Sequence, residues 1–361
     1  MSKTSIISIY DKSPKIAILE STFAARNKSQ ATGLVGSALS FVMHSLFKKA
    51  ELPLLILFRN KEEAAYYLND LEQLLNTEDV LFYPSSYRRP YQIEETDNAN
   101  ILLRAEVLNR INSRKKPAII VSYAEAIFEK VVTRKELEKN TLKLAVSDNL
   151  SIDFINETLF EYNFKRVDFV TEPGEFSVRG GIIDVFSFSN DNPYRIEFFG
   201  NEVDSIRSFD VETQLSIEKL KKISIIPNVE NKLLQESRES FLDYISEKTV
   251  IVIQNTESLG EQLDKLFSKA KEAFGALSSD IKHAPPEELF LDQKQFLRRA
   301  LDFAVVELQA KAVFKIDKSV EFHIQPQPSF NKQFDLLLNN LSENHFNGLK
   351  NYLCCSNENQ A

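Results

Sequence analysis

Six of the nine glycines fall in two short stretches, and the first of these, TGLVGSALS, has the outline of a phosphate-binding loop. In such a loop the backbone N–H groups curl around a phosphate, a lysine neutralises its charge and a hydroxyl holds Mg²⁺. The frame is kept here at Gly33 and Gly36 and at the hydroxyl side chains of Ser37 and Ser40. An ordinary helix start with small residues is the alternative interpretation. Backbone N–H groups at a helix start attract anions, so we expect at most an adventitious sulfate or phosphate at Gly33–Ser40.

The residues that a working nucleotide site needs are missing from this stretch. Leu39 stands where the lysine is required and Ala38 where the second glycine is required. Leucine can neither pair with a triphosphate nor tolerate its charge nearby. The Mg²⁺-binding aspartate that normally ends an apolar strand is also absent, because the run TVIVI continues into Gln254 and Asn255. We therefore expect this chain to have no catalytic residue, no metal site and no cofactor, and not to be an enzyme by itself.

The second glycine-rich stretch predicts an antiparallel sheet with one unusual face. In YRIEFF (194–199) strict alternation places Arg195, Glu197 and Phe199 opposite an apolar set. Arg179 lies on the corresponding outward side of its own strand, and the pair Gly180–Gly181 is expected to form a bulge or turn that aims it. Two arginines and an aromatic ring have the composition of a protein-binding hot spot. Solvated arginines beside an edge phenylalanine are the alternative.

Composition excludes several other classes of protein. The chain has 361 residues, 43% hydrophobic and 27% charged, with a net charge of −8, which argues against a surface dedicated to coating nucleic acid or anionic membranes. The two cysteines are adjacent and the four histidines lack zinc-ligand spacing, so neither a disulfide framework nor a zinc site is supported. No signal peptide begins the chain, and its longest apolar runs, of about seven residues, are far below the ~20 that span a bilayer. We expect a cytoplasmic protein with no membrane partner.

Strands and helices alternate along the first part of the chain. The apolar run 52–58 predicts a buried parallel strand, and an amphipathic helix is expected to follow it over 60–76. Residues 80–83 and 117–122 read as further short strands, and residues from about 15 to 50 read as helical with a glycine-containing break. This alternation predicts a doubly wound α/β layer.

The pattern changes after residue 138 and then returns. A helix over 152–162 and four or five alternating runs between 166 and 208 predict a smaller α+β domain, with a helix against an antiparallel sheet. The α/β rhythm resumes after residue 227, with a helix over 233–246, a strand over 249–253 and a long helical region from 257 to 312. The small domain is therefore expected to be inserted into the larger one. Residues 329–361 are expected to begin a further α/β domain that stops within this chain, with a helix at FNKQFDLLLNNL (330–341) and a strand at NYLCC (351–355). The predicted boundaries are 1–138, 139–226, 227–328 and 329–361.

The segment EPGEFSVRGGIIDVF, followed by PYRIEFFGNEVDSIRSFDVETQLS, resembles the second domain shared by the bacterial transcription-repair coupling factors and the excision-nuclease subunit UvrB. TGLVGSALS resembles the degenerate phosphate loop of the coupling factors, whereas UvrB keeps an intact, lysine-bearing loop. The two motifs occur in the expected order. The resemblance implies a helicase-like domain in two parts, 1A with the degenerate loop (1–138) and 1B (227–328), interrupted by domain 2 (139–226).

The resemblance also implies a partner. In this family domain 2 docks the damage-recognition subunit UvrA through residues that correspond to Arg179, Arg195 and Phe199. UvrB carries a long DNA-clamping hairpin, for which the stretch after Tyr87 leaves little room. The function expected is a non-catalytic scaffold that recruits UvrA for transcription-coupled nucleotide excision repair. RNA polymerase, double-stranded DNA and the ATP- and Mg²⁺-dependent motor would involve regions outside this chain.

Two other functions remain as alternatives. The first is a UvrB-like ATP-dependent helicase, which requires ATP turnover by this chain. The second is a direct DNA-binding module, for which Arg88–Arg89 and Arg114–Lys116 are the compact basic clusters. Each cluster is more often part of a solvated loop. A salt-dependent shift with plain duplex DNA would favour the second alternative.

Overall fold

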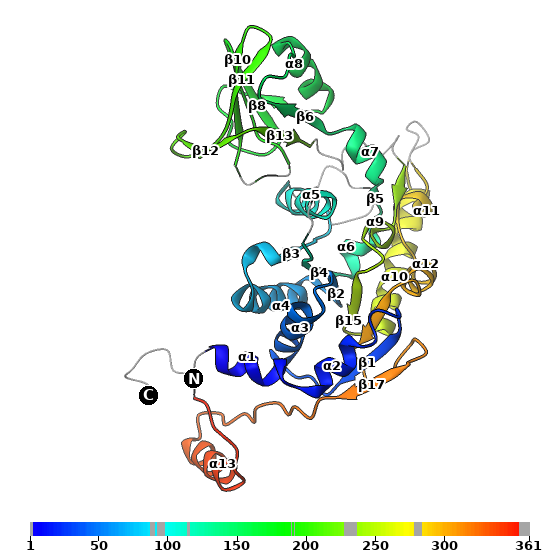
Figure 1. Cartoon of the computed structure of the whole chain (residues 1–361). Helices are drawn as coiled ribbons and strands as arrows, with labels where there is room; N and C mark the ends of the chain where they lie inside the picture. The colour runs from blue at the N-terminus through cyan, green and yellow to red at the C-terminus, as the bar shows by residue number, and fades with distance from the viewer. Residues whose placement is uncertain are drawn as a thin grey trace. The chain divides into compact units, whose positions relative to one another are not determined.

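Seven parallel strands form the central sheet of the computed structural model (Figure 1), in the spatial order β17-β1-β16-β15-β2-β4-β3 among the residues described. The structure describes residues 3–86, 91, 98–113, 116–188, 190, 192–226, 237–277 and 284–353. The strands are β1 (Lys28–Thr32), β2 (Leu54–Phe58), β3 (Val80–Phe82), β4 (Ile119–Tyr123), β15 (Val250–Ile253), β16 (Ala304–Glu307) and β17 (Lys318–Glu321).

This sheet has helices on both faces. Figure 1 shows α3 (Ala38–Ala50) and α4 (Lys61–Leu74) on one side and α10 (Thr256–Gly275) and α12 (Gln293–Ala300) on the other. Because both faces are covered, all five residues of β2 are buried, as the apolar sequence LLILF requires. The remaining helical segments around the sheet are α1 (Lys3–Asp11), α2 (Pro14–Glu20), the 3₁₀ turn η1 (Thr77–Asp79), α5 (Asn98–Ser113), α6 (Ala124–Phe128), α7 (Arg134–Lys139), α9 (Phe241–Tyr244) and α11 (Pro286–Leu289).

The strand order interleaves two distant parts of the sequence. β1 pairs with β16, and β2 pairs with β15, so strands that precede residue 124 lie beside strands that follow residue 249. The intervening chain forms a separate antiparallel part. The prediction of an α/β fold with a parallel sheet and a separate antiparallel sheet is confirmed, whereas the four predicted domain boundaries stay predictions.

Two strands of the parallel sheet were missed by the sequence analysis. The helical prediction for residues 15–50 is wrong over β1, whose sequence KSQAT is polar and lacks the apolar run of the other strands. β16 was likewise read as part of a long helical region. Both pair with neighbours on each side, and these hydrogen bonds outweigh the weak local preference. The helix expected to run to residue 246 is instead the short strand β14 (Arg238–Glu239) followed by α9.

Six further strands build the second sheet, which is antiparallel except for one pair. Its order is β12-β11-β10-β9-β8-β7, with β7 parallel to β8. The strands are β7 (Lys165–Arg166), β8 (Glu175–Arg179), β9 (Ile182–Val185), β10 (Tyr194–Phe199), β11 (Glu202–Phe209) and β12 (Ser216–Leu220). Two small ladders accompany it, β6 (Leu142–Ala145) with β13 (Lys222–Ile225) and β5 (Val131–Val132) with β14.

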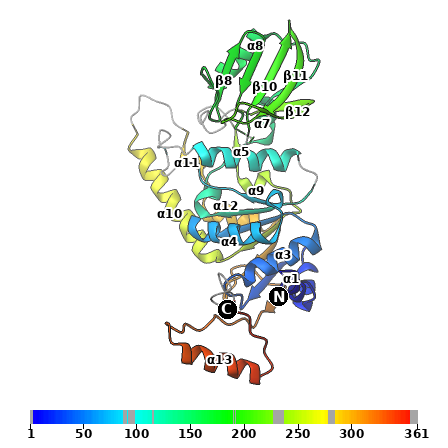
Figure 2. The ribbon, with the colours of Figure 1, turned by 90° about the vertical axis from the view of Figure 1, so that its left-hand side faces the viewer.

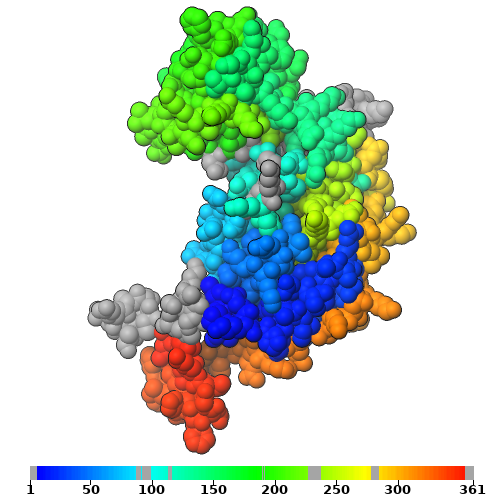
Figure 3. Space-filling model, in the orientation of Figure 1, coloured from blue at the N-terminus to red at the C-terminus, as the bar shows by residue number. Residues whose placement is uncertain are grey.

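Helix α8 (Ile152–Glu161) covers one face of this antiparallel sheet. Ile155 and Leu159 of α8 pack in one core with strand residues that include Ile183 and Ile196, and Ser151 caps the helix by accepting the Phe154 N–H at 3.1 Å. In Figure 2 the face that α8 leaves uncovered turns towards the viewer. Figure 3 shows the side chains of this part, in green, gathered into one continuous lobe. We call this uncovered side the outer face.

A second compact unit comprises residues 323–361. Its described part contains α13 (Phe334–Phe346), which agrees with the helix expected from the sequence, and residues 347–353 contain no strand. The strand suggested by NYLCC extends beyond the described residues at its second half. In the part of the chain that the structure describes, none of the helices combines the length and apolarity needed to cross a bilayer.

Candidate partner-binding site

The register of the antiparallel sheet brings charged residues of three strands side by side on the outer face. Asp184 of β9 lies opposite Arg195 of β10 and opposite Ser177 of β8. Arg179 lies two residues beyond Ser177 along β8, opposite Ile182. Since alternate residues share a face, Arg195 points to the side opposite the buried Ile196. The structure therefore brings Arg179 and Arg195 to the same carboxylate.

Asp184 binds both arginines. Its carboxylate accepts from Nε of Arg195 at 2.7 Å and from Nη2 at 2.8 Å, a bidentate pair, and it also accepts from Nη2 of Arg179. Gln214 accepts further hydrogen bonds from Arg195 through its backbone and side-chain oxygens. The hydrogen bonding of the Arg195 guanidinium to Asp184 is the main reason that the pKa of Arg195 is raised above its usual value.

The two arginines differ in exposure. The Arg195 side chain is only 16% exposed, because Asp184 and Gln214 surround its guanidinium. The Arg179 side chain is 41% exposed. Phe199 is 83% exposed at the end of β10. Arg179 and Phe199 are therefore open to solvent in this chain, whereas Arg195 is mostly covered, and the role of all three as a partner-binding site stays a prediction.

Turns at one end of the sheet position the exposed pair. Gly180 has φ +58° in the turn between β8 and β9, and Gly200 has φ +64° in the turn between β10 and β11. Both values lie in the left-handed region that glycine enters without a steric penalty. The register of β10 against β11 also shifts between Glu197 and Phe198. Arg179 and Phe199 are therefore the last residues of their strands at this end.

Glu197, another charged residue of the outer face, is also paired within the sheet. Glu197 accepts from Oγ of Ser205 at 2.6 Å and pairs with Arg207, both on β11. The exposed large apolar residues of the antiparallel part are fewer than its charged ones. They are Phe154, Phe160, Phe169, Phe199, Leu215, Ile217 and Val146. The first two lie on α8, on the opposite side of the sheet from Arg179.

The glycine loop after β1 has a structural partner that the sequence did not reveal. Gly33 has φ +71°, and a Cβ atom there would lie 1.8 Å from the carbonyl oxygen of Phe322. The Phe322 N–H donates to the carbonyl of Thr32 at 2.7 Å, and this hydrogen bond brings the segment after β1 and the segment after β17 together. Close approach of the backbone after β17 therefore requires glycine at this position.

The other loop residues are engaged within the protein. Leu39 is buried in α3, and Oγ of Ser40 donates to Oδ2 of Asp70 at 3.1 Å. Ser37 makes no side-chain cap to α3, and its Oγ lies 3.4 Å from the hydroxyl of Tyr66. Gly36 has φ +56°, and a Cβ atom there would meet no neighbour. The hydroxyl expected to hold Mg²⁺ in a working loop is thus bonded to a carboxylate of α4.

The end of β15 also has a local role. Asn255, near the position where a Mg²⁺-binding aspartate would be expected, is the N-cap of α10 and accepts the Ser258 N–H at 2.8 Å. Among the described residues, no group of three or more potential ligands is close enough to hold a metal ion.

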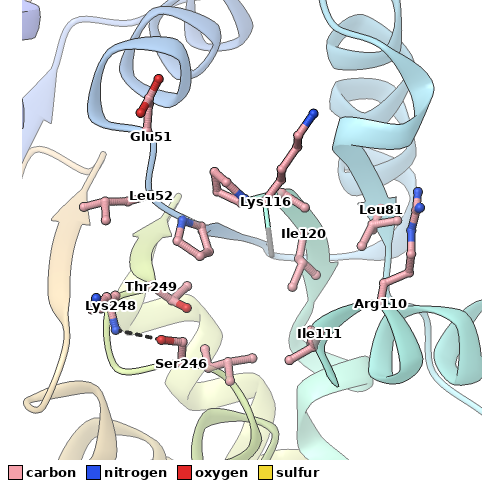
Figure 4. A pocket seen from close by; sticks show the side chains of 14 residues that line it. Glu51, Leu52, Leu81, Arg110, Ile111, Lys116, Ile120, Ser246, Lys248 and Thr249 are labelled. Atoms are coloured by element: carbon pink, nitrogen blue, oxygen red, sulfur yellow. Dashed lines mark hydrogen bonds between the residues drawn. The ribbon is translucent and has the colours of Figure 1, made fainter. Parts of the chain in front are cut away.

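A cavity of about 370 Å³ lies at the amino edge of the parallel sheet, beside the residues that precede β2, β4 and β15. Figure 4 shows Ile111 and Ile120 close together, with Lys116 extending away from them. Its lining is largely apolar, with Ser246 and Thr249 contributing hydroxyls. The glycine loop lies at the opposite edge of the parallel sheet from this cavity. The loop follows the carboxyl end of β1, whereas the cavity lies beside the amino ends of β2, β4 and β15.

Sequence reasoning missed the residue that organises the outer face. Asp184 interrupts the apolar strand IIDV and is 1% exposed. An acidic residue in a buried strand signals a paired charge, because an isolated buried carboxylate is costly. Gln214, which covers Arg195, lies in a turn and carried no such signal.

Comparisons with known proteins agree with this geometry. Residues 142–230 match the family model of the UvrB interaction domain. The transcription-repair-coupling factor of Bacillus subtilis is 33% identical over 213 residues, which cover 59% of this chain and 18% of that protein. The coupling factor of Myxococcus xanthus is 29% identical over 252 residues, covering 67% of this chain and 21% of that protein. The UvrABC system protein B of Clostridium botulinum (strain 657) is 29% identical over 253 residues, covering 66% and 36%.

The antiparallel part of the molecule is therefore similar to the UvrB interaction domain over residues 142–230. About three fifths to two thirds of the chain is similar to part of the bacterial transcription-repair-coupling factors, and the match spans about a fifth of the length of these relatives.

Proposed function

We propose that this chain acts as a non-catalytic recruitment module that docks UvrA through its UvrB interaction domain in transcription-coupled nucleotide excision repair. The observation that carries the proposal is the exposed pair of Phe199 and Arg179 on the face that α8 leaves uncovered. An exposed aromatic ring beside an arginine has the character of a hot spot, because the ring supplies buried area and the guanidinium supplies directed hydrogen bonds.

The Asp184 carboxylate supports this role. A partner carboxylate that reaches Arg179 meets a guanidinium already held at one end, so less side-chain freedom is lost on binding. Arg195 contributes indirectly, because its two hydrogen bonds hold the Asp184 carboxylate to which Arg179 is also bound. We infer that Arg179 and Phe199 contact UvrA directly and that Arg195 acts mainly by positioning.

Loss of nucleotide chemistry is the second part of the proposal. Leu39 and the Ser40–Asp70 hydrogen bond take the places of the lysine and the free hydroxyl that a nucleotide loop needs. Calorimetry with Mg²⁺ and ATP is expected to show neither binding nor turnover by this chain. The coupling to RNA polymerase and to double-stranded DNA would come from other regions of a longer protein.

The direct test is a titration of purified UvrA with the whole chain, with and without ATP. Replacing Phe199 by alanine should weaken the complex about 30-fold, which corresponds to about 2 kcal/mol. Phe154→Ala is the matched control, because Phe154 is an exposed phenylalanine on α8. Equal affinity of the wild-type and Phe199→Ala chains for UvrA would refute the proposed docking site.

A UvrB-like helicase is the second candidate, favoured by the similarity to UvrABC system protein B over two thirds of the chain. ATP turnover by this chain would establish it. For a DNA-binding module, the residues 87–90 and 114–115, which include most of both basic clusters and the place of the UvrB hairpin, lie outside the described residues. A mobility shift with duplex DNA at increasing salt tests that function independently.

A further inference from the structure

Phe169 is a second exposed aromatic residue beside the docking arginine. It is 62% exposed, and the guanidinium carbon of Arg179 lies 5.3 Å from the centroid of its ring. This distance is within the range of a cation–π interaction. Arg179 therefore has a carboxylate at one side and an aromatic ring at another, while Phe199 lies at the same end of the sheet.

The chain around Phe169 is anchored to β8. The Val167 N–H donates to the carbonyl of Phe176 at 2.9 Å, and Oγ of Ser177 donates to the carbonyl of Asp168 at 3.1 Å. Val170, the next residue, is buried in the interior. The aromatic ring is thus presented to solvent by a segment that is fixed on both sides, which reduces the entropy lost when a partner covers it.

The strand order places the two rings on opposite sides of Arg179. Phe169 follows β7, which pairs with β8 along the edge away from β9, whereas Phe199 ends β10 on the far side of β9. Within the described residues, Nε and Nη1 of Arg179 have no hydrogen-bond partner. An arginine with open donors between two exposed rings is suited to a partner surface that has a carboxylate between two apolar contacts.

We propose that Phe169 is a further anchor of the docking surface, so that the UvrA-binding site extends over β8 to the segment 167–170. This inference rests on the proposed function and adds a residue that the motif Arg179, Arg195 and Phe199 does not contain. Phe169 acts in two ways: its ring is covered by the partner, and its face holds the Arg179 guanidinium in the orientation that the partner meets.

The test is a titration of UvrA with whole-chain variants at fixed salt. Phe169→Ala is expected to weaken binding at least tenfold, and Phe169→Trp, which keeps the aromatic face, to stay within threefold of wild type. In the Arg179→Ala background the same Phe169→Ala change should have a smaller effect than in the wild-type chain, because the guanidinium that the ring orients is gone and only the ring's own contact with the partner remains. Phe154→Ala again serves as the control, and circular dichroism checks that each variant is folded.

The outcomes separate this inference from the proposed function. If Phe199→Ala weakens binding and Phe169→Ala leaves it unchanged, the extension to Phe169 is wrong while UvrA docking stands. If neither substitution changes the affinity, both proposals fail. If Phe169→Ala weakens binding equally with and without Arg179, the ring is an independent contact and the orienting role is wrong. If Phe169→Ala alters the fold, Phe169→Leu, which keeps apolar volume but removes the aromatic face, decides: wild-type affinity of that folded variant overturns the proposal, and weakened binding supports it.

Discussion

Asp184 holds Arg195 through two parallel hydrogen bonds, 2.7 Å from Nε and 2.8 Å from Nη2, while the carboxylate itself is almost completely buried. Arg179 reaches the same carboxylate from the neighbouring strand. The three residues form one unit on an otherwise uncovered sheet face, and the unit has one more positive than negative charge. A buried acid therefore determines how the more exposed Arg179 is presented.

Asp184→Ala is predicted to lower the free energy of unfolding by about 3 kcal/mol, because it leaves the largely covered Arg195 guanidinium without its carboxylate. Urea unfolding of the whole chain measures the change. Asp204→Asn, an exposed acid on β11, is the matched control and should change stability by less than about 0.5 kcal/mol. A stability of Asp184→Ala equal to that of wild type would show that the pair is not structurally important.

Arg179→Ala and Arg195→Ala are predicted to separate contact from positioning. Arg179 is more exposed and uses one nitrogen on Asp184, so its loss should weaken UvrA binding about tenfold or more with little change in stability. Arg195→Ala should reduce both quantities, because it leaves the buried Asp184 with one partner fewer. Paired titration and urea unfolding experiments check this. A loss of stability in Arg179→Ala as large as that in Arg195→Ala would contradict the assignment.

Gly33→Ala is predicted to destabilise the larger domain by about 2 kcal/mol or more, since a Cβ atom would overlap the Phe322 carbonyl and the residue has positive φ. Gly36→Ala has the same backbone strain without the clash, so a loss of only about 1 kcal/mol is expected. Thermal unfolding of both variants gives the comparison. Equal melting temperatures for the two would mean that the chain after β17 moves away at little cost.

The sequence predicted the parts of the fold in which local pattern and tertiary environment agree. The run LLILF is apolar throughout and became a strand buried on both faces, and the alternation in YRIEFF gave the outward set of β10. KSQAT, by contrast, has no strand pattern of its own. It pairs on both sides with strands that lie about 270 or more residues further along the chain, and no local window contains that information.

For the candidate site too, the sequence predicts some features and not others. Alternation and composition sufficed to select Arg179, Arg195 and Phe199, because strand periodicity fixes which side chains share a face. Their exposure did not follow, since it depends on Gln214 from a turn and on Asp184 from a different strand. The reason for Gly33 was also hidden, because the atom it accommodates belongs to Phe322. Strand periodicity predicts which side chains share a face of the sheet, whereas tertiary contacts determine which of them are exposed to solvent.

Tyr194, beside Arg195 on the inner side of β10, is predicted to make the molecule sensitive to alkaline pH. Burial raises the pKa of its hydroxyl to about 12, above the ordinary value of 10.0. The folded chain therefore keeps this proton between pH 10 and 12 while the unfolded chain loses it, so the unfolded state is favoured as the pH rises. The stability that Tyr194 contributes is fully present below pH 10 and should fall by about 2 kcal/mol across this window.

Tyr194→Phe should show a correspondingly shallower decline in stability with pH, measured by urea unfolding at a series of pH values. Tyr244, whose pKa is also raised to about 12 by burial, accounts for part of what remains. An identical decline in wild type and Tyr194→Phe would show that the Tyr194 hydroxyl titrates normally in the folded chain.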